Sequence, residues 1–144
     1  MKRVPQIKSV MTPFPYSVDR DAPLHEARAF MMQEGIRHLP VTKDGVLVGM
    51  ITDRDIKLVL GPDFDYPTEE ELSVNDVMVE HAYTVDLHER LDNVLDYMAE
   101  HHVGSAMVTR NGKLAGIFTA TDACRAFSAH LREQFAPPDG DGAA

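Results

Sequence analysis

Near the start of the chain, hydrophobic residues recur at spacings of three and four: Leu24, Ala27, Phe30 and Met31. This spacing predicts an amphipathic helix over residues 23–34. Asp21 is the expected N-cap, because an aspartate before a proline in the first turn is typical of a helix start. Gly35 is the expected left-handed stop.

After this helix, two runs of hydrophobic residues predict strands at 38–42 and 46–51. The Asp44-Gly45 pair between them is typical of a tight hairpin turn. A short extended segment at 16–18 precedes the helix, and a second helix is expected from Thr52 or Asp53 to just before Gly61.

The same pattern returns 67 positions later without a gap. Each of the following residues meets an identical residue at that shift: Val10, Met11, Tyr16, Val18, Asp19, Leu24, Met31, Val41, Thr42, Gly45, Leu47, Gly49, Thr52 and Asp55. The second unit is therefore expected to have an extended segment at 84–86, a helix at 88–100, strands at 105–109 and 113–118, and a last helix at 121–135. We interpret the chain as a duplicated β-α-β-β-α unit of mixed α/β (α+β) class.

The repeat divides the chain into four parts. Residues 1–61 form the first repeat, 62–73 an acidic linker, 74–136 the second repeat, and 137–144 a tail rich in proline, glycine, aspartate and alanine. The composition of the linker suits a solvated segment, and that of the tail predicts disorder. We expect neither to form a site.

Charge and composition exclude several classes of function. With 14 Lys and Arg against 23 Asp and Glu, the net charge of −9 argues against nucleic-acid binding. No apolar run is long enough for a membrane span or an export signal. Cys124 is the only cysteine, which excludes intrachain disulfides and favours a cytoplasmic location.

Chemistry concentrates where the second strand of each hairpin meets the next helix. Thr52 and Asp55 follow Gly49, and Thr119 and Asp122 follow Gly116. A threonine followed three residues later by an acid is a capping box. The same groups suit a nucleoside phosphate, because the aspartate accepts from a ribose diol and the helix N-terminus favours a phosphate. Both readings are compatible, and the glycines would permit close backbone approach.

These residues resemble the cystathionine-beta-synthase (CBS) domain. The resemblance rests on VMTP at 10–13, IRHLPV at 36–41 and VGMITDRD at 48–55, and on VM at 77–78, VGSAMV at 103–108 and GIFTATD at 116–122. It implies a tandem pair, or Bateman module, whose repeats are related by pseudo-two-fold symmetry and pack sheet against sheet. It also implies two clefts between the repeats that bind adenosine-containing ligands.

In this family each cleft draws residues from both repeats. Carried over by position, the cleft of the first motif contains His38, Thr52, Arg54, Asp55, Met78, His81, Tyr83 and Val103. The cleft of the second motif contains Met11, Phe14, Tyr16, Ile36, Ser105, Thr119, Thr121 and Asp122. His38, Arg54 and His81 favour phosphorylated nucleotides in the first cleft. The second is expected to accept a nucleoside, a nucleotide or nothing.

Other chemistry receives less support from the sequence. The seven histidines show no spacing typical of metal ligands, so no metal site is predicted, and Met31, Met50, Met98, Met107 and Cys124 are expected to pack in the core. No pattern typical of a catalytic nucleophile or a P-loop occurs, so no catalytic residue or required cofactor is expected.

We therefore expect a regulatory sensor for a ligand of the AMP, ADP or ATP class, acting as a homodimer on an unknown protein partner. The alternative is a constitutive dimerisation or assembly module with empty clefts, which would use helix surfaces around 27–31, 94–98 and 59–60.

Overall fold

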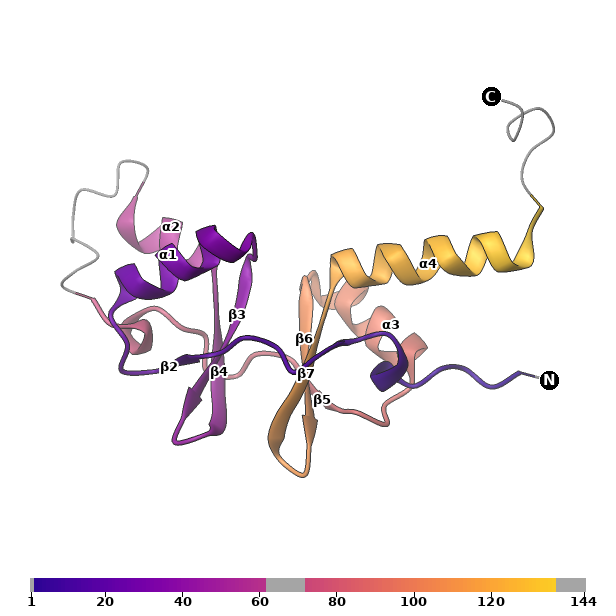
Figure 1. Cartoon of the computed structure of the whole chain (residues 1–144), viewed down its shortest axis with the longest axis horizontal. Helices are drawn as coiled ribbons and strands as arrows, with labels where there is room; N and C mark the ends of the chain where they lie inside the picture. The colour runs from indigo at the N-terminus through magenta and orange to yellow at the C-terminus, as the bar shows by residue number, and fades with distance from the viewer. Residues whose placement is uncertain (1, 62–71, 137–144) are drawn as a thin grey trace.

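The computed structural model describes residues 2–61 and 72–136, and Figure 1 shows two halves of similar design set side by side. Residues 62–71 of the predicted linker at 62–73, and the whole predicted tail at 137–144, lie outside the described residues. The elements in chain order are η1 (Ile7–Ser9), β1 (Thr12–Pro13), β2 (Val18–Asp19), α1 (Leu24–Glu34), β3 (His38–Lys43), β4 (Val46–Thr52), α2 (Asp53–Leu60), η3 (Val74–Asp76), β5 (Thr84–Asp86), α3 (Leu91–His101), β6 (Ser105–Arg110), β7 (Lys113–Thr119) and α4 (Ala120–Gln134).

Two sheets repeat one design. One sheet has the order β2-β3-β4 and the other β1-β7-β6-β5. In each sheet a short parallel strand joins an antiparallel hairpin, and the register irregularity falls at equivalent places, Val41/Thr42 and Val108/Thr109. The mixed α+β class and the duplication predicted from the sequence are thus confirmed. Strands β4 and β7 contact each other where the two halves meet.

The two hairpin turns have the predicted form. Asp44 and Gly45 have φ angles of 52° and 81°, and Asn111 and Gly112 have 52° and 80°. Two successive positive φ angles define the type I′ turn, whose twist matches that of the flanking strands. The turn residues therefore fix the register of both hairpins.

The first helix begins within one residue of the predicted start, but its predicted N-cap was wrong. Its N-cap is Pro23, and no side chain caps it. Asp21 instead pairs with Lys43, and its backbone N–H donates to Asp19 Oδ1 at 2.8 Å. The equivalent helix α3 begins at Leu91 rather than residue 88, because the His88 N–H donates to Asp86 Oδ2 at 2.9 Å in a local turn.

Both helices end in the left-handed region. Gly35 has a φ of 66° at the end of α1, as predicted. Its counterpart at the shift of 67 positions is His102, which has a φ of 55°. Only the first helix therefore ends on the residue type that adopts this conformation without strain.

Each half donates a segment to the other, which the sequence did not reveal. Strand β1 pairs with β7 through Thr12↔Ile117, and an isolated bridge joins Met50 of β4 to Val79. Ile7 is buried in the core of the second half, and Val74 and Val77 are buried in the core of the first. The leading segments of the two repeats are therefore exchanged.

Gly49 and Gly116 make this exchange possible. A methyl group on Gly49 would lie 2.5 Å from the Val79 carbonyl oxygen, and one on Gly116 would lie 2.9 Å from the Thr12 carbonyl oxygen. The close approach expected at these glycines is thus made by the exchanged segments of the chain itself.

Burial of the sulfur-containing residues follows the prediction with one exception. Met31, Met98 and Met107 are buried, and Met50 is half-buried. Cys124, expected in the core, is an exposed residue of α4.

Candidate ligand-binding clefts

The first Thr-x-x-Asp motif is a capping box at the start of α2. The Asp55 N–H donates to Thr52 Oγ1, and the Thr52 N–H donates to Asp55 Oδ2, both at 3.1 Å. Within the described part of the chain, no hydrogen bond reaches the other carboxylate oxygen of Asp55. One oxygen therefore holds the helix cap, and the second is free to accept.

The second motif repeats this arrangement at the start of α4. The Thr119 N–H and Oγ1 donate to Asp122 Oδ2 at 2.9 and 3.2 Å, and the Asp122 N–H donates to Thr119 Oγ1 at 3.4 Å. Oδ1 receives a weaker hydrogen bond from Thr12 Oγ1 at 3.3 Å and lies 3.9 Å from the Arg125 guanidinium. The Asp122 side chain is only 10% exposed.

Asp122 lines a cavity of about 840 Å³ between the two halves. Six of the residues predicted for this cleft line it: Phe14, Tyr16, Ile36, Thr119, Thr121 and Asp122. Met11 and Ser105 are not among its lining residues. Met11 lies against Gly116, and Ser105 lines the other cavity, where its hydroxyl donates to Met50 Sδ at 3.2 Å.

Asp55 lines a second cavity, of about 540 Å³. Seven of the residues predicted for this cleft line it: His38, Thr52, Arg54, Asp55, His81, Tyr83 and Val103. Met78 does not, because it packs against the core of the first half. Each cavity thus joins the capping box of one repeat to the leading segment of the other.

The family model for the CBS domain matches residues 7–61 and 74–129. The chain belongs to the CBS domain family. Hypoxic response protein 1 of Mycobacterium tuberculosis is 34% identical to this CBS pair over 116 residues, which are 78% of each protein. Inosine-5'-monophosphate dehydrogenase of Thermoplasma acidophilum is 29% identical over 123 residues, 85% of this chain but only 24% of that enzyme. The chain thus spans about a quarter of that relative.

Solved CBS pairs share the fold. The CBS domain pair of protein MJ0100, in complex with 5′-methylthioadenosine and S-adenosyl-L-methionine, has a TM-score of 0.78 at 23% identity, with 89% of this chain and 99% of that chain covered. CBSX2 in complex with AMP has a TM-score of 0.76 at 22% identity, with coverage of 87% and 97%. Hypoxic Response Protein I with two coordinated zinc ions has a TM-score of 0.70 at 28% identity, with coverage of 84% and 98%.

The clefts of this CBS pair contain several side chains that the sequence analysis missed. Thr12 and Arg125 line the Asp122 cavity, Tyr97 and His102 line the Asp55 cavity, and Arg37 lines both. One signal could have identified Tyr97, because residues 83 and 97 are the repeat equivalents of 16 and 30. Both pairs are aromatic contacts: Tyr16 meets Phe30 edge to face at 5.1 Å, and Tyr83 stacks on Tyr97 at 3.8 Å between ring centroids.

Basic side chains line both clefts of the CBS pair. Arg54 and His81 line only the Asp55 cavity, and Arg125 lines only the Asp122 cavity. The larger cavity therefore also carries cations. This reduces the difference in phosphate binding that the sequence led us to expect between the two clefts. The pKa of His38 is lowered, and burial of the ring is the largest cause. The Asp55 carboxylate opposes this shift, and the Arg37 guanidinium adds to it. The imidazole is therefore neutral at pH 7.

The described residues hold neither a metal cluster nor a membrane-spanning helix. Within 2–61 and 72–136, no three His, Cys, Asp or Glu side chains lie close enough together to hold a metal ion. No helix in the same ranges is long and apolar enough to cross a membrane.

Proposed function

We propose that this CBS pair is a non-catalytic regulatory module that binds an adenosine-containing ligand, of the AMP, ADP or ATP class, between its repeats. Occupancy is relayed to a partner protein. The observation that carries the proposal is the divided role of Asp122. One carboxylate oxygen is fixed in the helix cap, and the other accepts only a long hydrogen bond beside a cavity of about 840 Å³. Asp55 repeats this arrangement in the second cavity.

The chemistry of the larger cavity suits each part of a nucleotide. A carboxylate accepts two hydrogen bonds from a ribose diol, which would replace the long bond from Thr12. The N-terminus of α4 and the guanidinium of Arg125 favour a phosphate. Tyr16 and Ile36 offer apolar surface to a purine base. No cofactor is needed for this role.

Known complexes of related folds support this class of ligand. AMP, 5′-methylthioadenosine and S-adenosyl-L-methionine, which occupy the two solved CBS pairs described above, share the adenosine group. The carboxylate of this chain would meet the ribose of any of them. The adenosine group is therefore the part of the ligand that this carboxylate recognises.

The composite clefts suggest how binding is relayed. Tyr16 and Ile36 come from the first repeat, and Thr119 and Asp122 from the second, so a ligand in this cavity would contact both halves. Such a ligand favours the relative arrangement of the halves that it binds more tightly. A partner, or a second copy of the chain in a homodimer, would respond to that arrangement.

The test is thermal unfolding of the whole chain with millimolar AMP, ADP, ATP, S-adenosylmethionine or NAD. A ligand at about 100 times its dissociation constant should stabilise the fold by about 2.7 kcal/mol. Asp55→Ala and Asp122→Ala should each lose the ligand-induced shift of one cleft. Asp96→Ala, an exposed carboxylate on α3 outside both cavities, is the matched control and should keep the full shift. If no ligand shifts the midpoint, the sensor proposal fails.

One observation favours the alternative, a constitutive dimerisation module. The helices expose large apolar side chains, including Met32 on α1, Leu58 on α2 and Phe127 on α4. The surfaces expected from the sequence were wrong in part. Ala27, Met31, Val94, Met98 and Leu60 are buried in the protein's own cores, whereas Val59, Leu95 and Tyr97 are exposed. Sedimentation would favour assembly if a dimer formed equally well with both Asp55 and Asp122 changed to alanine and with no ligand present.

A further inference from the structure

Arg37 and His38 line both cavities. His38 is the first residue of β3 and Arg37 precedes it, so the two side chains stand at the boundary between the halves. The wall between the two clefts is therefore built partly from one guanidinium and one imidazole.

The second repeat does not duplicate this wall. At the shift of 67 positions, Gly104 replaces Arg37 and Ser105 replaces His38. A methyl group on Gly104 would lie 3.4 Å from His38 Nε2, so the imidazole lies directly against the glycine. A symmetric module would have a separate basic pair for each cleft, but here one pair serves both.

The charges around this pair leave it available to a ligand. No carboxylate among residues 2–61 and 72–136 forms an ion pair with the Arg37 guanidinium. Asp55 is the carboxylate that acts on His38, and its Oδ2 is already engaged by the Thr52 N–H. A phosphate in either cavity would therefore find the same unneutralised cation.

We propose that Arg37 and His38 couple the two clefts, so that an anionic ligand in one lowers the affinity of the other for a second anionic ligand. This inference rests on the proposed function and adds a rule of occupancy to it. A phosphate in one cavity neutralises the Arg37 guanidinium and orients its donors toward that cavity. A second phosphate, in the other cavity, is then attracted less by this guanidinium and is repelled by the first phosphate. An uncharged nucleoside has no phosphate to compete for the pair, so it should fill both clefts independently.

The experiment is calorimetric titration with AMP and, as its uncharged counterpart, adenosine. Asp55→Ala and Asp122→Ala each leave one intact cleft and give the affinity of that cleft alone. In the unaltered chain the second AMP should bind at least about 5-fold more weakly than the one-cleft variants predict, within the usual range of coupling between sites. The readout is a ratio: the affinity of the cleft alone, from the one-cleft variants, divided by the affinity for the second AMP when the other cleft is filled. A ratio is used because loss of a cation also weakens each affinity directly.

The variants that decide the role of the shared pair are Arg37→Ala combined with His38→Gln. We expect the coupling to fall to a ratio near one in this double variant, with both sites retained. Arg110→Ala removes an exposed arginine of β6 that lines neither cavity, and it should leave the ratio unchanged. Adenosine should show a ratio near one in every variant.

Each outcome separates this inference from the proposed function. Two AMP molecules that bind independently, or coupling that survives in the double variant, would overturn the coupling and leave the proposed function intact. A single AMP bound by the unaltered chain supports coupling if both one-cleft variants still bind AMP, and overturns it if only one does. A chain that binds neither AMP nor adenosine overturns both proposals.

Discussion

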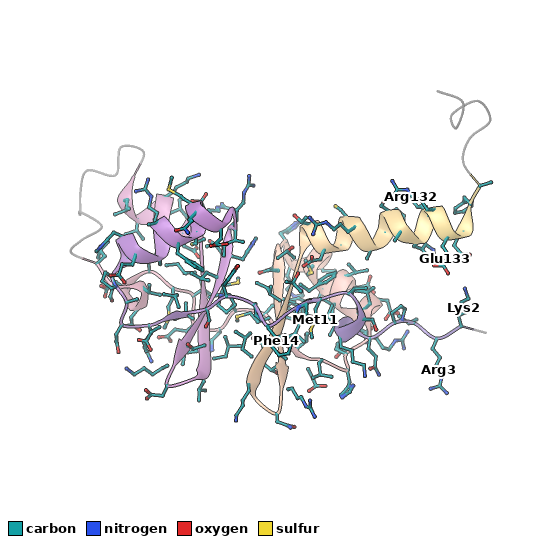
Figure 2. All side chains as sticks on the ribbon, viewed as in Figure 1. Lys2, Arg3, Met11, Phe14, Arg132 and Glu133 are labelled. Carbon is teal, nitrogen blue, oxygen red and sulfur yellow. The ribbon has the colours of Figure 1, made fainter. Side chains whose placement is uncertain are left out.

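Phe14 holds a backbone conformation that phenylalanine rarely adopts. Its φ is 47°, and its N–H donates to the Ala115 carbonyl at 3.0 Å as β1 leaves β7. The ring is 92% exposed, so its packing within the protein does not offset this strain. Figure 2 shows Phe14 at the junction of the two halves, and the residue lines the Asp122 cavity. Strained residues of this kind cluster at binding sites.

We therefore expect Phe14→Gly to be more stable than Phe14→Ala by about 1 kcal/mol, because only glycine adopts a positive φ without steric cost. Chemical denaturation of both variants measures this difference. Equal free energies of unfolding would show that the backbone at Phe14 is relaxed. Both variants should weaken AMP binding at the Asp122 cleft, since both remove the ring from its wall.

His38 predicts a pH dependence of stability. Burial lowers the pKa of His38 below its ordinary value of 6.5, so the unfolded chain binds a proton at this residue more readily than the folded one does. The stability that depends on a neutral His38 is therefore complete above pH 6.5 and is lost as the pH falls through the lower folded pKa. We expect the free energy of unfolding of the unaltered chain to decrease more steeply on acidification than that of His38→Gln. Urea titrations from about pH 8 to about pH 5 test this, and parallel curves would contradict it.

At the scale of elements, the signals that succeeded were local ones. Apolar spacing identified α1, the Asp-Gly and Asn-Gly pairs identified the hairpins, and the Thr-x-x-Asp motifs marked the starts of α2 and α4. Strand β1 escaped notice because two residues give no periodicity and their partner lies more than a hundred positions away. The N-cap of α1 was wrongly assigned to Asp21 because this side chain pairs with Lys43.

The exchanged segments make a sharp prediction for Gly49. A methyl group there would meet the Val79 carbonyl oxygen at 2.5 Å, and backbone on both sides prevents an easy shift. We expect Gly49→Ala to lower the free energy of unfolding by about 1–3 kcal/mol, as overpacking typically does. The control is Gly104→Ala, whose methyl group would contact only the His38 ring at 3.4 Å and should cost less. If the two variants were equally stable, β4 and the segment at 79 would not pack as closely as described.

At the scale of the molecule, the resemblance to the CBS family, carried over to both repeats, predicted most of the cleft residues but not which residues line both clefts. Equivalent positions of the two repeats have the same place in the fold, so most of the residues carried over by position line the expected cavities. Met11 and Met78 do not line them, because the exchanged segments place Met11 against Gly116 and Met78 against the core of the first half. The shared role of Arg37 could not be predicted from one repeat, since it depends on the small residue that the other repeat places opposite.

The exchange also means that neither sequence repeat contains its own complete core. The first core requires Val74 and Val77, which lie beyond residue 61, and the second requires Ile7, which precedes residue 74. Full burial of one such side chain contributes about 1.5–3 kcal/mol, a large share of the stability of a small domain. A fragment of residues 1–61 should therefore lack cooperative unfolding, whereas a fragment of residues 14–79 holds every buried residue of the first core and should unfold in a sigmoidal transition.

Circular dichroism during urea titration compares the two fragments directly. The fragments of residues 1–71 and 72–144, mixed in equal amounts, should recover the cooperative transition that neither shows alone, because each supplies the segment that the other lacks. A cooperative transition in residues 1–61 alone, with the same midpoint as in residues 14–79, would contradict this account. The repeat boundary in the sequence would then also be the boundary of the folding unit, and a ligand between the halves would join two independent domains.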